Sequence, residues 1–166
     1  MIKIDKTISN YNYFFILFSV ICAGLLAVSC NDSSEASDFP ECFVGTYINE
    51  EGSGARSMWN IYKDGNFAGE SSTQEVLNFS GQIGSWIKTG SREAHIALID
   101  FSFDEDGVEK NIARADIDIT FIGENCEETV GSFELRFFED DEDPLDISSD
   151  DGEVIEDTFT GRKLVL

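Results

Sequence analysis

Apolar and polar residues alternate in short runs along most of the chain beyond residue 42. The alternation is clearest near residue 115, where Ala113, Ala115, Ile117, Ile119 and Phe121 are interleaved with Arg114, Asp116, Asp118 and Thr120. Residues 129–138 repeat the pattern with Phe133, Leu135 and Phe137. A period of two places one set on each face of a strand, so both runs predict half-buried β-strands.

The same criterion predicts about eight strands, at residues 43–49, 56–63, 66–73, 81–88, 93–103, 108–121, 129–138 and 153–166. Turn signals such as Asp64-Gly65 and Asp106-Gly107 separate them, and residues 74–80 predict a helical turn or a bend. Antiparallel strands joined by short turns leave exposed edges unless the sheet closes. We therefore expect an all-β fold, a single antiparallel up-and-down barrel, with a two-sheet β-sandwich as the alternative.

Several short motifs resemble segments of a known group of barrel proteins. Residues 84–89 and 92–103, followed by Asp106-Gly107 and Ile112-Ala113-Arg114, resemble small secreted lipocalin-like (calycin) barrel proteins. Gly45-Thr46-Tyr47 resembles the G-x-W of the first lipocalin strand, with Tyr in place of Trp. The resemblance implies a closed barrel, and such barrels host many different functions.

The N-terminus has the three-part pattern of an export signal. Lys3 and Lys6 precede an uncharged run of fifteen residues, 14–28, which suits a signal peptide and is short of the roughly 20 residues of a membrane span. The run ends in Leu26-Ala27-Val28-Ser29-Cys30, which resembles a bacterial lipobox, although Ala27 stands where Leu is usual. We expect residues 1–29 to be a lipoprotein signal peptide and Cys30 to carry the lipid. The alternatives are an ordinary secretory cleavage site and an uncleaved anchor.

Residues 30–38 are polar and acidic, which predicts a flexible tether ahead of a barrel domain at residues 39–166. Acidic residues directly after the cysteine resemble an outer-membrane export signal, although any hydrophilic spacer would have a similar composition. The expected location is the bacterial cell envelope, with the protein attached to the outer membrane through the lipid on Cys30. The sequence leaves open whether it faces the periplasm or the cell surface, and leaves the oligomeric state open.

Charge and cysteine content restrict the partners and the compartment. The formal net charge of −22 repels nucleic acid and anionic lipid headgroups, so neither is an expected partner. With Cys22 in the signal and Cys30 lipidated, Cys42 and Cys126 remain as an even pair in an oxidising compartment. They predict a disulfide, with two free buried thiols as the alternative.

Candidate chemistry is sparse. His95 is the single histidine and no nucleophile motif accompanies it, so no catalytic residue and no zinc site is predicted. Eleven carboxylates fall within residues 139–157. Oxygen ligands at this density suit Ca²⁺, but their spacing does not follow an EF-hand loop, which favours a disordered, solvated segment. We expect neither a metal nor a cofactor, and enzymatic activity ranks third among the functions considered.

Aromatic residues on the predicted strands suggest a binding function. Tyr47, Trp59, Trp86 and Phe133 are candidates for lining a cup that holds a hydrophobic molecule, and the alternative is that they fill the core. The sequence thus predicts a non-catalytic envelope lipoprotein that binds a small apolar ligand in its barrel. A structural or interaction module that contacts an envelope protein or glycan is the alternative.

Overall fold

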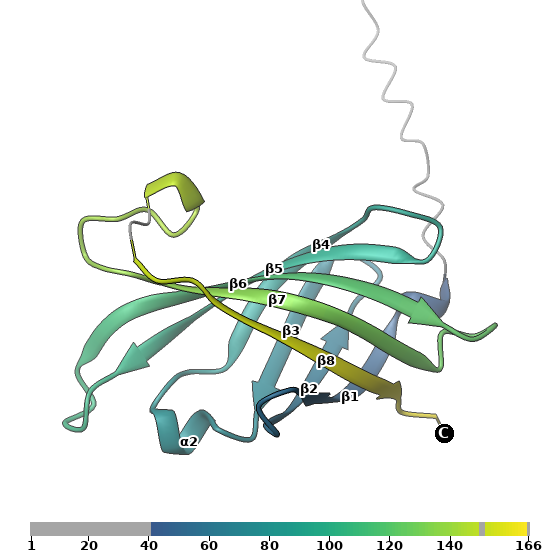
Figure 1. Ribbon diagram of the computed structural model, residues 1–166, viewed down its shortest axis with the longest axis horizontal. Coiled ribbons are helices and arrows are strands. Elements are labelled where there is room, and N and C mark those ends of the chain that lie inside the picture. Colours follow the sequence, from purple (N-terminus) through teal and green to yellow (C-terminus); the bar gives the residue numbers. More distant parts are fainter. Residues whose placement is uncertain (1–40, 150–151, 166) are drawn as a thin grey trace, which may run out of the picture. The chain divides into compact units, whose positions relative to one another are not determined.

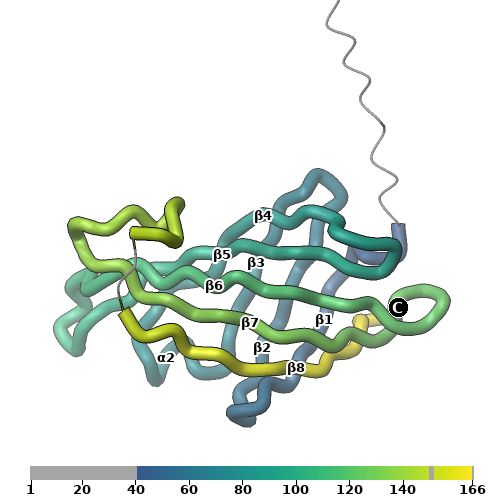
Figure 2. The backbone as a smooth tube through the Cα atoms, turned by 45° about the horizontal axis from the view of Figure 1, so that its top comes forward, coloured from purple at the N-terminus to yellow at the C-terminus, as the bar shows by residue number. Residues whose placement is uncertain are grey.

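The computed structural model describes residues 41–149 and 152–165, which belong to one compact unit, Phe39–Leu166. Its strands are β1 (Gly45–Glu51), β2 (Arg56–Ile61), β3 (Asn66–Ser71), β4 (Gln82–Lys88), β5 (Glu93–Phe103), β6 (Glu109–Ile122), β7 (Glu128–Phe138) and β8 (Ile155–Lys163). Each strand pairs antiparallel with the next, and β8 pairs with β1 to close the barrel (Figures 1 and 2). The predicted up-and-down barrel is therefore confirmed.

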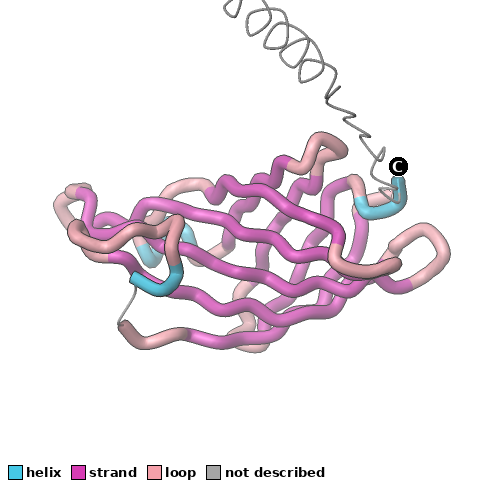
Figure 3. The backbone as a smooth tube through the Cα atoms, turned by 90° about the horizontal axis from the view of Figure 1, so that it is seen from above, coloured by secondary structure: helices cyan, strands magenta, loops and turns pink. Residues whose placement is uncertain are grey.

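Three short helical segments interrupt the strands: η1 (Glu41–Phe43), α2 (Gln74–Leu77) and η2 (Ile147–Ser149), coloured cyan in Figure 3. The first corrects the predicted start of the first strand, because Phe43 ends a 3-10 turn and β1 begins at Gly45. Gly45 has φ of +150°, a conformation that side chains disfavour. It lets the chain change direction between the turn and the strand.

One end of the barrel is closed by aromatic packing. The Phe43 ring stacks on Phe121, with ring centroids 3.9 Å apart and an interplanar angle of 14°. The Tyr47 hydroxyl lies 3.1 Å from the carbonyl oxygens of both Cys42 and Phe43, to which it can donate. Phe43, Tyr47 and Phe121 are almost fully buried. The segment before β1 therefore plugs this end.

Cys42 and Cys126 meet at the same closed end. Their Cα atoms are 5.4 Å apart although the residues are 84 positions apart in sequence. The structure thus brings the two cysteines to disulfide-bonding distance, as their number predicted. The bond would tie η1 to the turn between β6 and β7.

The opposite end carries four connections between strands: β1–β2, β3–β4 with α2, β5–β6, and β7–β8 with η2. In Figure 1, α2 and η2 lie at this end, away from the C-terminus. The predicted signal peptide (residues 1–29), the predicted lipidation site Cys30 and the predicted tether (30–38) fall outside the described residues. Within the described ranges, no helix has the length and apolar character needed to cross a membrane.

Candidate functional site: a cavity at the open end of the barrel

A cavity of about 930 Å³ occupies the interior between the aromatic plug and the open end. Its volume is within the range typical of small-molecule sites, roughly 300–1,000 Å³. Apolar side chains make up most of the wall: Trp59, Leu98, Ala113, Ala115, Ile117, Phe133, Leu135, Phe137 and Ile155. Leu77 of α2 and the neighbouring Phe79 belong to the lining at the mouth.

Side-chain size along β6 explains why the interior is hollow at one end only. The inward-facing residues run from Ala113 and Ala115 near the open end to Ile119 and Phe121 at the closed end. Small side chains leave space where large ones would meet across the barrel. The small residues of β6 therefore leave space for the cavity, and its large residues form part of the cavity floor.

The four aromatic candidates from the sequence divide between these two regions. Trp59 and Phe133 line the cavity, and Trp59 also makes an edge contact with Phe159 at 4.7 Å between ring centroids. Tyr47 and Trp86 are not among the lining residues. Tyr47 packs in the plug, and the Trp86 indole N–H donates to the carbonyl of Tyr62 at 2.8 Å. Neither Tyr47 nor Trp86 is therefore expected to contact a ligand in the cavity.

Three polar residues on the cavity wall were not predicted from the sequence. Asp100 of β5 is 6% exposed, and its Oδ2 accepts a hydrogen bond from Nε2 of Gln82 on β4 at 3.4 Å. Burial raises the pKa of Asp100 to about 6, and the Gln82 bond partly offsets that rise. Asn111 of β6 is 7% exposed. The available signal was the placement of these polar residues on faces that are otherwise apolar.

Two further carboxylates line the cavity towards its mouth. Burial raises the pKa of Glu51, and repulsion from Asp157 adds to the rise. The backbone N–H groups of Thr158 and Ser53 donate to Asp157, which lowers its pKa. The mouth therefore carries negative charge that the protein backbone partly stabilises.

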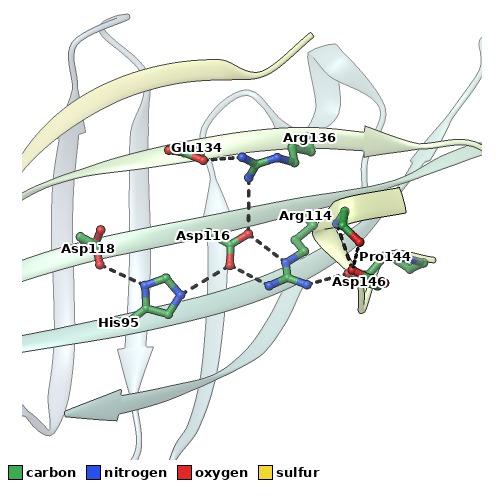
Figure 4. Close-up of polar contacts among 9 residues, drawn as sticks. His95, Arg114, Asp116, Asp118, Glu134, Arg136, Pro144 and Asp146 are labelled. Carbon is green, nitrogen blue, oxygen red and sulfur yellow. Dashed lines mark hydrogen bonds and ion pairs between the residues drawn. The ribbon is translucent and has the colours of Figure 1, made fainter. Parts of the chain in front are cut away.

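His95 lies on the outside of the barrel, separated from the cavity by the wall. Figure 4 shows the imidazole between two carboxylates of β6, with Nδ1 3.0 Å from Asp118 Oδ1 and Nε2 3.5 Å from Asp116 Oδ1. Asp116 also pairs with Arg114 at 2.8 Å and with Arg136 at 3.7 Å. These contacts hold the β5–β7 wall together and give His95 no access to the cavity.

The acidic segment returns against this outer face. Arg114 donates from Nη1 to the Pro144 carbonyl at 2.9 Å (Figure 4). Carboxylates of the segment cap its own backbone, as where Asp146 Oδ1 accepts from the Ser148 N–H at 3.0 Å. Over residues 139–149, hydrogen-bonded turns thus replace the expected disordered loop. In the part of the chain that the structure describes, no cluster of His, Cys, Asp or Glu could hold a metal ion.

Comparison with protein-family models, curated proteins and solved structures found no match to this chain.

Proposed function

We propose that this protein is a non-catalytic binding protein that holds a small apolar molecule inside its barrel, as the lipocalin-like resemblance of its sequence suggests. The cavity of about 930 Å³, lined mainly by apolar side chains and open at one end, is the observation that carries the proposal. Each ~100 Å² of apolar ligand surface removed from water contributes roughly 2.5 kcal/mol to binding, from which the entropy cost of association is subtracted.

The two tryptophans provide an internal test of where a ligand binds. Trp59 lines the cavity, whereas Trp86 lies outside the lining with its indole bonded to Tyr62. In a Trp86→Phe variant, titration with a hydrophobic dye or an aliphatic probe should change the Trp59 fluorescence saturably, with about one probe per chain. In the matched Trp59→Phe variant, the Trp86 emission should change little. Equal responses of the two variants would place the binding site elsewhere.

Filling the cavity should abolish binding without unfolding the barrel. Ala115 faces the cavity, so Ala115→Phe is expected to weaken probe binding at least tenfold, because the ring occupies the ligand's space. Ala68→Phe, on the outward-facing side of β3, is the matched control and should bind normally. If the folded wild-type protein binds no apolar probe, the cavity is not a ligand site, and the interaction-module alternative is favoured.

We also propose that the protein is anchored in the bacterial cell envelope through lipid on Cys30, at the outer membrane. The apolar run 14–28 ending at Cys30 supports this, and disulfide-distance cysteines suit an oxidising compartment. Cys30→Ala should abolish incorporation of a labelled fatty acid and release the protein from the membrane fraction. Cys22→Ala, inside the proposed signal peptide, should leave labelling intact. Undiminished labelling of the Cys30→Ala variant would refute the anchor.

A further inference from the structure

Asp100 is a buried carboxylate with an unused acceptor in the cavity wall. Its Oδ2 accepts from Gln82, whereas its Oδ1 has no hydrogen-bond partner. A buried polar atom without a partner destabilises a protein. Such atoms are few in native proteins, and Asp100 is 94% buried. A ligand in the cavity is one source of the missing donor.

Asn111, another residue of the cavity lining, has a second buried acceptor without a partner. Its Oδ1 also lacks a partner. In the β5–β6 pairing, Asp100 lies opposite Ala113 and Ser102 lies opposite Asn111. Asp100 and Asn111 are therefore diagonal neighbours on the inner face, a spacing of about 7–8 Å between Cα atoms. One ligand group between them could donate to both side chains.

The charged residues of the cavity lining favour a cation. Glu51, Asp100 and Asp157 contribute three carboxylates, whereas Lys110 contributes the one ammonium group. The net charge of −22 for the whole chain adds to the negative potential. A low-dielectric pocket lined with one sign of charge concentrates ligands of the opposite sign.

We infer that the cavity binds an apolar molecule with a protonated amine, whose N–H groups donate to the side-chain oxygens of Asp100 and Asn111. The inference rests on the proposed function, because it specifies the chemistry of the ligand for the same cavity. With its pKa raised to about 6, Asp100 is mainly ionised at neutral pH, and a bound ammonium group would stabilise that ionised form. The apolar wall would hold the hydrocarbon part of the ligand.

Three probes with the same alkyl chain and different head groups test this inference: dodecylamine, dodecanol and dodecanoate. Each displaces a neutral hydrophobic dye from the purified protein, at concentrations below micelle formation. The amine should bind about tenfold or more tightly than the carboxylate, as expected for a charge-assisted hydrogen bond. The Ala115→Phe variant should no longer bind the dye, so its binding of each probe is measured directly by calorimetry. Loss of amine binding in that variant separates cavity binding from attraction to the acidic surface.

Asp100→Asn is the decisive variant, because it keeps the side-chain shape and removes the charge. It should lose most of the preference for the amine while still binding dodecanol. Asp118→Asn, the same change on the outer face of β6, should keep the preference. Equal binding of the three probes, or preference for the carboxylate, would overturn the inference and leave the proposed function standing. If none of the probes displaces the dye and the dye itself does not bind, the proposed function fails as well.

Discussion

At the scale of single residues, Asp100 is unusual because it places a carboxylate in a mainly apolar interior. An ionised carboxylate is unfavourable in an apolar environment, and one hydrogen bond from Gln82 compensates only in part. The residue therefore lowers the stability of the empty barrel. Residues that weaken the fold while facing a cavity are common at binding sites, because function there opposes stability.

Asp100→Asn should stabilise the ligand-free protein at neutral pH. The folded-state pKa of about 6 lies above the ordinary value of 3.8, so the penalty for ionising Asp100 is fully present above about pH 6. That penalty fades as the pH falls through 6 towards about 4. We expect a gain on the order of 2 kcal/mol in the free energy of unfolding at about pH 7.5, and almost none near pH 4.

Denaturant unfolding at both pH values measures this difference. Asp141→Asn in the exposed acidic segment is the matched control and should have almost no effect at either pH. A destabilised Asp100→Asn variant at neutral pH, or a gain that does not depend on pH, would contradict the assignment of a raised pKa to Asp100.

At the scale of elements, β6 combines two tasks on its two faces. Its inner face grades from alanine to phenylalanine and so shapes the cavity, and its outer face carries the Arg114–Asp116–His95 contacts. Arg114 also holds the returning acidic segment through the Pro144 carbonyl. The outward-facing Phe138 at the end of β7 is only 1% exposed.

Arg114→Met should free the acidic segment without unfolding the barrel. Methionine retains much of the side-chain volume but cannot donate to Pro144 or pair with Asp116. A glutamate-specific protease should then cleave the 139–149 segment several-fold faster, whereas global stability should fall by about 1–2 kcal/mol. Limited proteolysis followed by mass analysis provides the readout. Arg162→Met on β8 is the matched control, and equal cleavage rates in the two variants would exclude this role for Arg114.

At the scale of the whole molecule, two long-range connections determine the shape of the interior. The pairing of β1 with β8 closes the sheet, and the Cys42–Cys126 contact fixes the plug against the β6–β7 turn. Lys163 at the end of β8 adds a hydrogen bond from Nζ to the Cys42 carbonyl at 2.8 Å. The floor of the cavity is therefore held by residues from both ends of the described chain.

Reducing the Cys42–Cys126 disulfide should lower the free energy of unfolding by about 4–5 kcal/mol, because a long loop regains its freedom in the unfolded chain. Denaturant unfolding of the oxidised and reduced proteins measures the loss. A variant with both cysteines changed to serine should match the reduced protein. If two thiols react with an alkylating agent in the native, untreated protein, the disulfide is absent.

The sequence by itself determined the strands and their faces. Period-two alternation is a local property, so the approximate strand positions and the inward set of residues on β6 and β7 followed from it directly. The even pair of Cys42 and Cys126 likewise predicted their proximity. The unfavourable edges of an open sheet predicted that the barrel closes.

Only the tertiary structure decided how deep in the barrel each inward-facing side chain lies. Tyr47, Trp59, Trp86 and Phe133 all alternate inward, yet only Trp59 and Phe133 reach the cavity, because the packing of Phe43 against Phe121 sets where the floor lies. The roles of Asp100 and Asn111 depend in the same way on neighbours from other strands. Alternation specifies which side of a strand a residue faces, whereas the space in front of it depends on side chains that are distant in sequence.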